Sequence, residues 1–379
     1  MNRTPRIRLT AGIAVAACLL AACGGDDDAA ATTTEAVATT TEAPATTTAP
    51  TSPETTVAPT TSTTEAPDGF DEPDGPRQPL TGVPVDSDAD IIQRPALAVK
   101  IDNHPLARPN HSGIAVADVV FEEMVEGSLT RFAAVFHTND ADPIGPIRSG
   151  RSQDVALLTS FNEPLFAWSG GNPGVTELVR NSLLTDLNWQ RNANSYSRGS
   201  GSAPHNLYSS SERLYSLTPD DHPGPPEQQF GYLEEGEPFG GEAATDIEMT
   251  IGSIDIEWDW NAETESFDRR QEGGPHVDKT YGALSFENVI VLVVDYRPSQ
   301  IDASSPEAQT VGDGPVFVFS NGEVIMGRWF REDIASPLTL TDDNGDEIEL
   351  SVGSTFIELG EAIPSDDISN PAVDLRFNP

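Results

Sequence analysis

The chain has 379 residues, of which 61 are acidic and 21 are basic, and its net charge is −40 at neutral pH. So much negative charge repels phosphate backbones and anionic lipid surfaces, and we therefore expect no nucleic-acid partner. Both cysteines, Cys18 and Cys23, lie near the N-terminus, and a chain cleaved before Cys23 could form no internal disulfide.

Residues 1–22 are predicted to be a lipoprotein signal peptide. Three arginines near the start precede an apolar run, residues 9–20, that is too short to span a bilayer. The run ends in the letters LAACG, residues 20–24, which match the bacterial lipobox. The match implies cleavage before Cys23 and attachment of lipid to its thiol, with enough acyl chains for stable anchoring. We therefore expect a protein that is lipid-anchored to the cell membrane through Cys23 and faces outside the cytoplasm.

Residues 23–90 are expected to form a disordered stalk. They are rich in Thr, Pro and Ala and hold almost no large apolar side chains, so they cannot offset the entropy lost on ordering. Frequent proline favours the polyproline II conformation, which rises about 3.1 Å per residue. A stalk of this length could hold the folded part on the order of 100 Å from the membrane. We interpret it as a spacer through the cell wall.

Residues 91–217 are predicted to form an N-terminal α/β domain with a mixed sheet, because apolar strand-like runs alternate with short helical segments. The pattern predicts strands over 96–101, 119–121 and 129–136 and helices over 152–158 and 175–180. A stretch rich in Pro, Gly and Glu, residues 218–245, is predicted to be the linker to the next domain.

Residues 246–379 are predicted to form a smaller, mainly antiparallel β domain of four to six strands. The dipeptides at 321–322 and 344–345 are both Asn-Gly, which supplies the positive φ angles of a tight turn. Each lies between two strand-like segments and therefore predicts a hairpin. A further strand is expected over 287–294. The fold class as a whole is α+β, or α/β, after a disordered stalk.

Four arginines of the N-terminal domain are unusual in so acidic a chain: Arg108, Arg131, Arg148 and Arg151. Three of them lie on loops stiffened by Pro and Gly at strand ends, where α/β sheets tend to place ligand sites. Converging guanidinium groups would bind a carboxylate or a phosphate through paired hydrogen bonds. The alternative is that the arginines only brace the loops, by pairing with the internal carboxylates Asp118, Glu122, Glu123 and Glu126.

His205 is the candidate for acid–base chemistry, held in a turn between Pro204 and Asn206. As a general base it would need a carboxylate within hydrogen-bond reach, and Asp102, Asp118 or Glu122 could supply one. The alternative is a histidine that only bridges two backbone segments. The full set of candidate ligand-binding residues is Asp102, Asn103, Arg108, Arg131, Arg148, Ser149, Arg151, His205 and Asn206.

His276 and Asp278 form a His-x-Asp pair that could present two metal ligands, although a simple turn is the alternative. No third ligand can be named, so we expect no metal. The sequence contains no Walker loop, no Gly-x-Ser-x-Gly elbow, no HExxH and no dinucleotide fingerprint. We expect no cofactor.

Several separate motifs resemble the YerB-like family of bacterial lipoproteins. They include DNHP at 102–105, ARP at 107–109, TRF at 130–132, GPIRS at 145–149, APHNL at 203–207, ENVIVLVVDYR at 287–297 and GEVIMGRW at 322–329. The resemblance covers essentially the whole chain beyond the stalk. It implies an N-terminal α/β domain and a smaller C-terminal domain, and it supplies no reaction and no ligand.

Three functions are open at this point. The leading hypothesis is a surface-anchored binding or scaffold protein whose arginine-lined site holds a polar or anionic ligand, such as a cell-wall fragment. The second is a cell-envelope hydrolase or transferase that uses His205 with a nearby carboxylate. The third is a structural or partner-docking module, for which the sequence names no protein partner.

Overall fold

The structure is a computed structural model that describes residues 75–363 and 373–379. These residues belong to one compact unit, Thr64–Pro379. The expected signal peptide, Cys23 and most of the expected stalk lie outside the described residues. The folded part begins before the expected boundary at residue 90, because Arg77 and Leu80 are already buried. A single leucine among prolines carries no periodic signal, so the sequence pattern did not reveal this packed segment.

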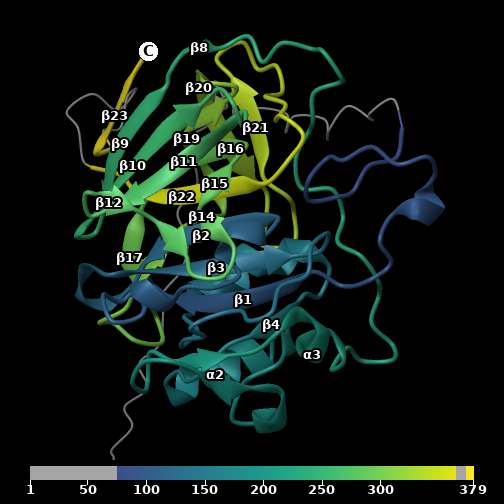
Figure 1. Cartoon of the computed structure of the whole chain (residues 1–379), viewed down its shortest axis with the longest axis vertical. Coiled ribbons are helices and arrows are strands. Elements are labelled where there is room, and N and C mark those ends of the chain that lie inside the picture. The colour runs from purple at the N-terminus through teal and green to yellow at the C-terminus, as the bar shows by residue number, and fades with distance from the viewer. Residues whose placement is uncertain (1–74, 364–372) are drawn as a thin grey trace, which may run out of the picture. The chain divides into compact units, whose positions relative to one another are not determined.

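One mixed sheet of eleven strands, counted over the described ranges, runs through both halves of the chain (Figure 1). Its order is β21-β20-β19-β16-β22-β2-β3-β1-β4-β5, with β8 paired to β20. The N-terminal half supplies β1 Leu97–Asp102, β2 Val119–Met124, β3 Thr130–Phe136, β4 Leu165–Ala167 and β5 Thr185–Asp186. The C-terminal half supplies β8 Glu242–Ala243, β16 Asn288–Val294, β19 Gly312–Ser320, β20 Glu323–Arg331, β21 Thr339–Asp342 and β22 Thr355–Glu361.

A second, antiparallel sheet comes from the C-terminal half of the chain. It contains β9 Asp246–Ile251, β10 Ile254–Asn261, β11 Ser266–Gln271, β12 Gly274–Pro275, β15 Ser285–Phe286 and β23 Leu375–Asn378. Three short pairs complete the strands: β6 Ser197–Arg198 with β7 Leu207–Tyr208, β13 Val277–Asp278 with β14 Gly282–Ala283, and β17 Tyr296–Pro298 with β18 Pro306–Ala308. The α-helices of the described chain are α1 Gln153–Leu158, α2 Pro173–Arg180 and α3 Ser211–Tyr215.

These elements confirm the fold class, a mixed N-terminal sheet with few helices followed by mainly antiparallel β structure. The two halves are joined inside the large sheet, because β2 pairs in parallel with β22, with Val119 opposite Thr355 and Glu122 opposite Glu358. The predicted linker, residues 218–245, therefore separates the two halves only along the sequence, because their strands β2 and β22 are neighbours in one sheet.

The large sheet is covered on both faces, which explains why its central strands are buried along their whole length. On one face the second sheet packs through aromatic side chains. The ring centroid of Phe356 lies 4.9 Å from that of Trp258 and 5.2 Å from that of Phe286. On the other face apolar residues of α1 and α2 pack against β1 to β4, and Phe121 meets Phe161 edge-on at 6.1 Å.

Candidate functional site

Most of the candidate residues gather where three parallel strands end. Strands β1, β2 and β4 run in the same direction, and β3 lies antiparallel between β1 and β2. Their carboxyl ends therefore meet at one edge, which we call the carboxyl edge, and such edges commonly form ligand sites in sheets of this kind. It comprises Asp102 at the end of β1, Glu126 after β2, Arg131 at the start of β3, the loop 148–151 and the loop 169–171 after β4.

Backbone and buried ionic contacts hold the loop 148–151 at this edge. The Arg148 amide donates to the carbonyl of Lys100 at 2.8 Å, and the Ser169 amide donates to the carbonyl of Arg148 at 2.8 Å. The Asp154 carboxylate accepts from the Arg151 amide at 2.6 Å and from the buried Lys100 ammonium at 2.7 Å. Lys100 also pairs with Glu123, whose pKa burial raises to about 7.

Arg148 is the more accessible of the two arginines beside Asp102. Its side chain is one-quarter exposed, and its Nε lies 3.3 Å from Asp102 Oδ2. Arg131 is buried and donates from Nη1 to the Ser149 carbonyl at 2.9 Å. Burial, followed by the positive charge of Arg151, lowers the pKa of Arg131 to about 10. Arg131 therefore stays charged at neutral pH, and the Asp102 carboxylate interacts with its charge as well as pairing with Arg148.

Arg151 lines a neighbouring pocket of about 190 Å³. Its Nε donates to Glu126 Oε2 at 3.0 Å, and its Nη1 donates to the Gly150 carbonyl at 2.8 Å. The cap residue of α2, Asn172, faces the same space and accepts from the Val175 amide at 2.9 Å. The lining residues are Glu126, Ser149, Gly150, Arg151, Ser152, Gly171, Asn172, Val175, Ser299, Asp302 and Ser305.

Arg108 and two of the polar candidates lie away from this group. The Arg108 Nε donates to the backbone carbonyl of Asn103 at 3.1 Å and lies 3.2 Å from its Oδ1. Asn206 accepts from Arg198 at 3.0 Å and donates to two carbonyls of the loop 199–201, so it fixes the β6–β7 hairpin. The structure thus brings together Arg131, Arg148 and Arg151, with Ser149 between them.

His205 does have a carboxylate partner, and that partner is Asp102. The two residues lie 103 positions apart in the chain, and His205 Nδ1 is 2.6 Å from Asp102 Oδ2. The other carboxylates considered for this role are engaged elsewhere. Asp118 accepts from the amide of Thr138 at 2.7 Å, and burial raises its pKa to about 6. Glu122 belongs to a cluster between the two sheets.

His104 is a site residue that we did not single out from the sequence. Its ring stacks on that of His205 with centroids 4.3 Å apart and planes 19° apart. Its Nδ1 accepts from the Leu106 amide at 3.1 Å, which places the proton of the neutral ring on Nε2. Burial, and then the neighbouring His205, lower the pKa of His104. The signal for it was the turn motif DNHP, in which it follows Asp102 by two positions.

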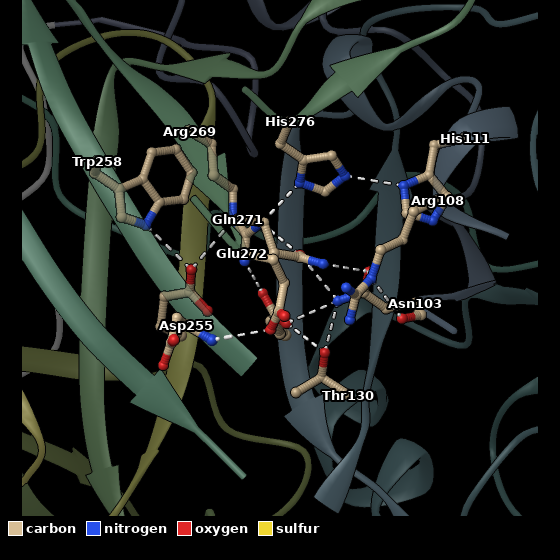
Figure 2. Close-up of polar contacts among 12 residues, drawn as sticks. Asn103, Arg108, His111, Thr130, Asp255, Trp258, Arg269, Gln271, Glu272 and His276 are labelled. Atoms are coloured by element: carbon tan, nitrogen blue, oxygen red, sulfur yellow. Dashed lines mark hydrogen bonds and ion pairs between the residues drawn. The ribbon is translucent and has the colours of Figure 1, made fainter. Parts of the chain in front are cut away.

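A buried polar cluster lies between the large sheet and the second sheet (Figure 2). Its centre is Arg269, which pairs with Glu122 and lies 3.5 Å from Glu358. Arg269 Nη1 donates to Gln271 Oε1 at 2.8 Å and to His276 Nδ1 at 2.7 Å. Figure 2 shows the Gln271 side chain meeting that of Asn103, whose Nδ2 donates to Gln271 Oε1 at 3.0 Å. Asn103 therefore holds the two halves of the chain together.

The histidines of this cluster form a chain with a fixed direction. A guanidinium can only donate, so His276 Nδ1 accepts from Arg269 and its Nε2 donates to His111 Nδ1 at 2.9 Å. His111 Nε2 then donates to the backbone carbonyl of Asp102 at 2.6 Å. Burial lowers the pKa of His111 to about 4 and that of His276 well below its usual value. Both rings are therefore neutral at pH 7.

The His-x-Asp pair does not converge on one point. Both ring nitrogens of His276 are already bonded, and the Asp278 carboxylate accepts from the amides of Thr280 at 2.9 Å and Tyr281 at 3.0 Å. Among the described residues no group of three His, Cys, Asp or Glu side chains is placed to hold a metal ion. The same residues include no helix that is both long and apolar enough to cross a bilayer.

Comparison with known proteins gives one family. Its description is a protein of unknown function (DUF3048), whose N-terminal domain profile matches residues 80–223 and whose C-terminal domain profile matches residues 246–357. A Bacillus subtilis strain 168 protein named "Putative lipoprotein YerB" is 24% identical over 266 residues, which are 67% of this chain and 77% of that protein. The crystal structure of the YerB protein from Bacillus subtilis aligns with a TM-score of 0.65 at 22% identity. That alignment covers 80% of this chain and 99% of the solved chain, and it shows a shared fold.

Proposed function

The chain belongs to the YerB-like family of unknown function (DUF3048), and from that premise we propose that it is a membrane-anchored lipoprotein that binds a small anion at its carboxyl edge. The anchoring part of the proposal rests on the lipobox that ends at Cys23 and on the name of the Bacillus subtilis relative. The stalk, in this proposal, carries the binding part outward from the membrane.

The observation that carries the binding role is a group of three arginines at one edge of a very acidic molecule. Arg131, Arg148 and Arg151 lie close enough for their charges to interact, and Asp102 and Glu126 pair with Arg148 and Arg151. A third carboxylate, Asp302, lines the same pocket and interacts with Arg151, so the three charges are balanced. Arg148 is nevertheless partly exposed, and a carboxylate or phosphate could accept hydrogen bonds from it.

The test is calorimetric titration of the purified full chain with inorganic phosphate and, separately, with acetate. We expect saturable binding that Arg148→Gln weakens by about tenfold, the loss of one charge-assisted hydrogen bond. Arg297→Gln is the matched control, because Arg297 is exposed and pairs only with the nearby Asp295 at 3.3 Å. Absence of binding to the unaltered protein would contradict the proposal. So would an Arg148→Gln variant that unfolds more easily and binds the anions unchanged, since Arg148 would then be a brace.

A second candidate function rests on the Asp102–His205 contact. An aspartate bonded to Nδ1 orients a histidine so that Nε2 can accept a proton, which is the arrangement of a general base. In this alternative the protein is a cell-envelope hydrolase or transferase, and the Nε2 proton of His104 is a donor beside the base.

The alternative is tested with p-nitrophenyl acetate as a generic acyl substrate. If His205 is a base, the full chain accelerates hydrolysis and His205→Gln removes about a hundredfold of that rate. His222→Gln serves as the control, because His222 is a surface histidine whose Nε2 donates only to a backbone carbonyl, that of Glu163, at 2.9 Å. Equal rates for the two variants would rule out a catalytic His205 toward this substrate.

A further inference from the structure

A second pocket, of about 470 Å³, lies where the β6–β7 hairpin meets the turn after β13. We call it the Lys279 pocket. Its volume falls within the range of small-molecule sites. Both halves of the chain build it, because Asn110, Ser112 and Tyr208 come from the N-terminal half and Lys279 and Thr280 from the C-terminal half. The remaining lining residues are Pro143, Ser197, Gly199 and Ser200.

Lys279 is one of only two lysines in the chain. The other, Lys100, is fully buried between Glu123 and Asp154. Lys279 is exposed, and its Nζ donates to the neutral Oδ1 of Asn110 at 3.1 Å. None of the ion pairs within the described ranges includes it, and its neighbour Asp278 is buried with its carboxylate on backbone amides. Lys279 therefore offers a positive charge that no carboxylate of the described residues neutralises by an ion pair.

The rest of the lining offers hydroxyl groups and a rigid apolar floor. Ser197 and Ser200 are exposed, and the structure gives their hydroxyls no bond to another described residue. Tyr208 is buried with its hydroxyl donating to the Asn110 carbonyl at 2.9 Å, which fixes the floor beside Pro143. Gly199 must lack a side chain here, because a Cβ would lie 2.6 Å from Tyr208 Cε2.

We propose that the Lys279 pocket binds a small hydroxylated organic anion, of the sugar-acid class. The carboxylate of such a ligand would pair with Lys279, and its hydroxyls would bond to Ser197, Ser200 and Thr280 over the floor of Tyr208. The pocket shares no lining residue with the arginine pocket of the carboxyl edge, so the two sites are separate binding sites.

The experiment is calorimetric titration of the full chain with D-glucuronate, with D-glucose as the neutral match and acetate as the anion without a hydroxylated body. We expect glucuronate to bind in the millimolar range and each of the other two to bind at least about tenfold more weakly. Lys279→Gln should weaken glucuronate binding by about tenfold, and Lys279→Arg should largely retain it because the charge is kept.

Arg148→Gln separates this site from the carboxyl edge. If the Lys279 pocket is the site, the tighter glucuronate binding survives Arg148→Gln, which removes only the weaker carboxylate binding that acetate also shows. Loss of the tighter binding in Arg148→Gln, with none in Lys279→Gln, would place glucuronate at the arginines and overturn the inference. It would be overturned as well if the unaltered protein bound no glucuronate, or bound acetate just as tightly. Lys279 is exposed, so its variants should keep the thermal midpoint of the unaltered protein, which is measured alongside.

Discussion

Arg269 carries one positive charge into a buried cluster that also holds two carboxylates, Glu122 and Glu358. Burial, and then the neighbouring Glu122, raise the pKa of Glu358 well above its usual value. Two buried carboxylates beside one guanidinium therefore favour the neutral form of Glu358. Its Oε1 still accepts from Trp258 Nε1 at 3.1 Å. An amide at this position could make the same bond.

If Glu358 is neutral, two substitutions in this cluster should have very different effects on the free energy of unfolding. Arg269→Met leaves the Glu122 charge buried without its partner and should lower the free energy of unfolding by about 3–5 kcal/mol. Glu358→Gln keeps a neutral group of the same shape and should change it by about 1 kcal/mol or less. Urea unfolding at pH 7 measures both. Adding Glu122→Gln to Arg269→Met should restore part of the loss, because it removes the stranded anion. If Glu358→Gln proved as costly as Arg269→Met, Glu358 would be ionised.

At the scale of elements, strong local signals in the sequence were sufficient to predict individual turns and helices. The Asn-Gly turn at 321–322 joins β19 to β20 with both φ angles positive, as the dipeptide predicts. Helices α1 and α2 form where the patterns place them, the second capped by Asn172. Strand β22 was not predicted, because the buried Glu358 interrupts its apolar run and the partner that stabilises it, Arg269, lies on a distant strand.

The candidate site was predictable in its residue types and not in its pairing. The arginines and the DNHP and APHN motifs pointed to loops that the structure brings together at the carboxyl edge. Which carboxylate meets His205 depends on the return of the chain from β7 to the end of β1, a contact between residues 102 and 205. The separation of Arg108 from the other arginines depends likewise on Asn103, which is held by β11 of the second sheet. No local pattern carries information about such long-range neighbours.

At the scale of the whole molecule, the two halves of the chain share the large sheet and should unfold together. Strand β2 lies between β22 of the C-terminal half and β3 of its own half, so separating the halves would expose an interior strand. Asn103 and Gln271 also exchange hydrogen bonds across the halves, at 3.0 Å in each direction. Loss of packing in one half should therefore propagate to the other.

We predict that the folded part unfolds in one cooperative transition, with equal calorimetric and van't Hoff enthalpies. Phe356→Ala, which removes a buried ring from β22, should cost about 3–5 kcal/mol and should speed amide exchange in β1 as well as in the C-terminal strands. Hydrogen-exchange mass spectrometry checks this. Two separate melting steps, or β1 protection that ignores Phe356→Ala, would show that the halves are independent domains.

The pairing of β2 with β22 also bears on whether the two halves could be encoded as separate chains. A gene that encoded only the N-terminal half would produce a sheet ending on β2, whose unpaired amides and carbonyls would recruit strands from other chains. A gene that encoded only the C-terminal half would likewise leave β22, with its buried Glu358, as an unpaired strand at the edge of the sheet. Separation of the halves should therefore expose edges that favour aggregation, and we expect the two segments to be kept together in one chain.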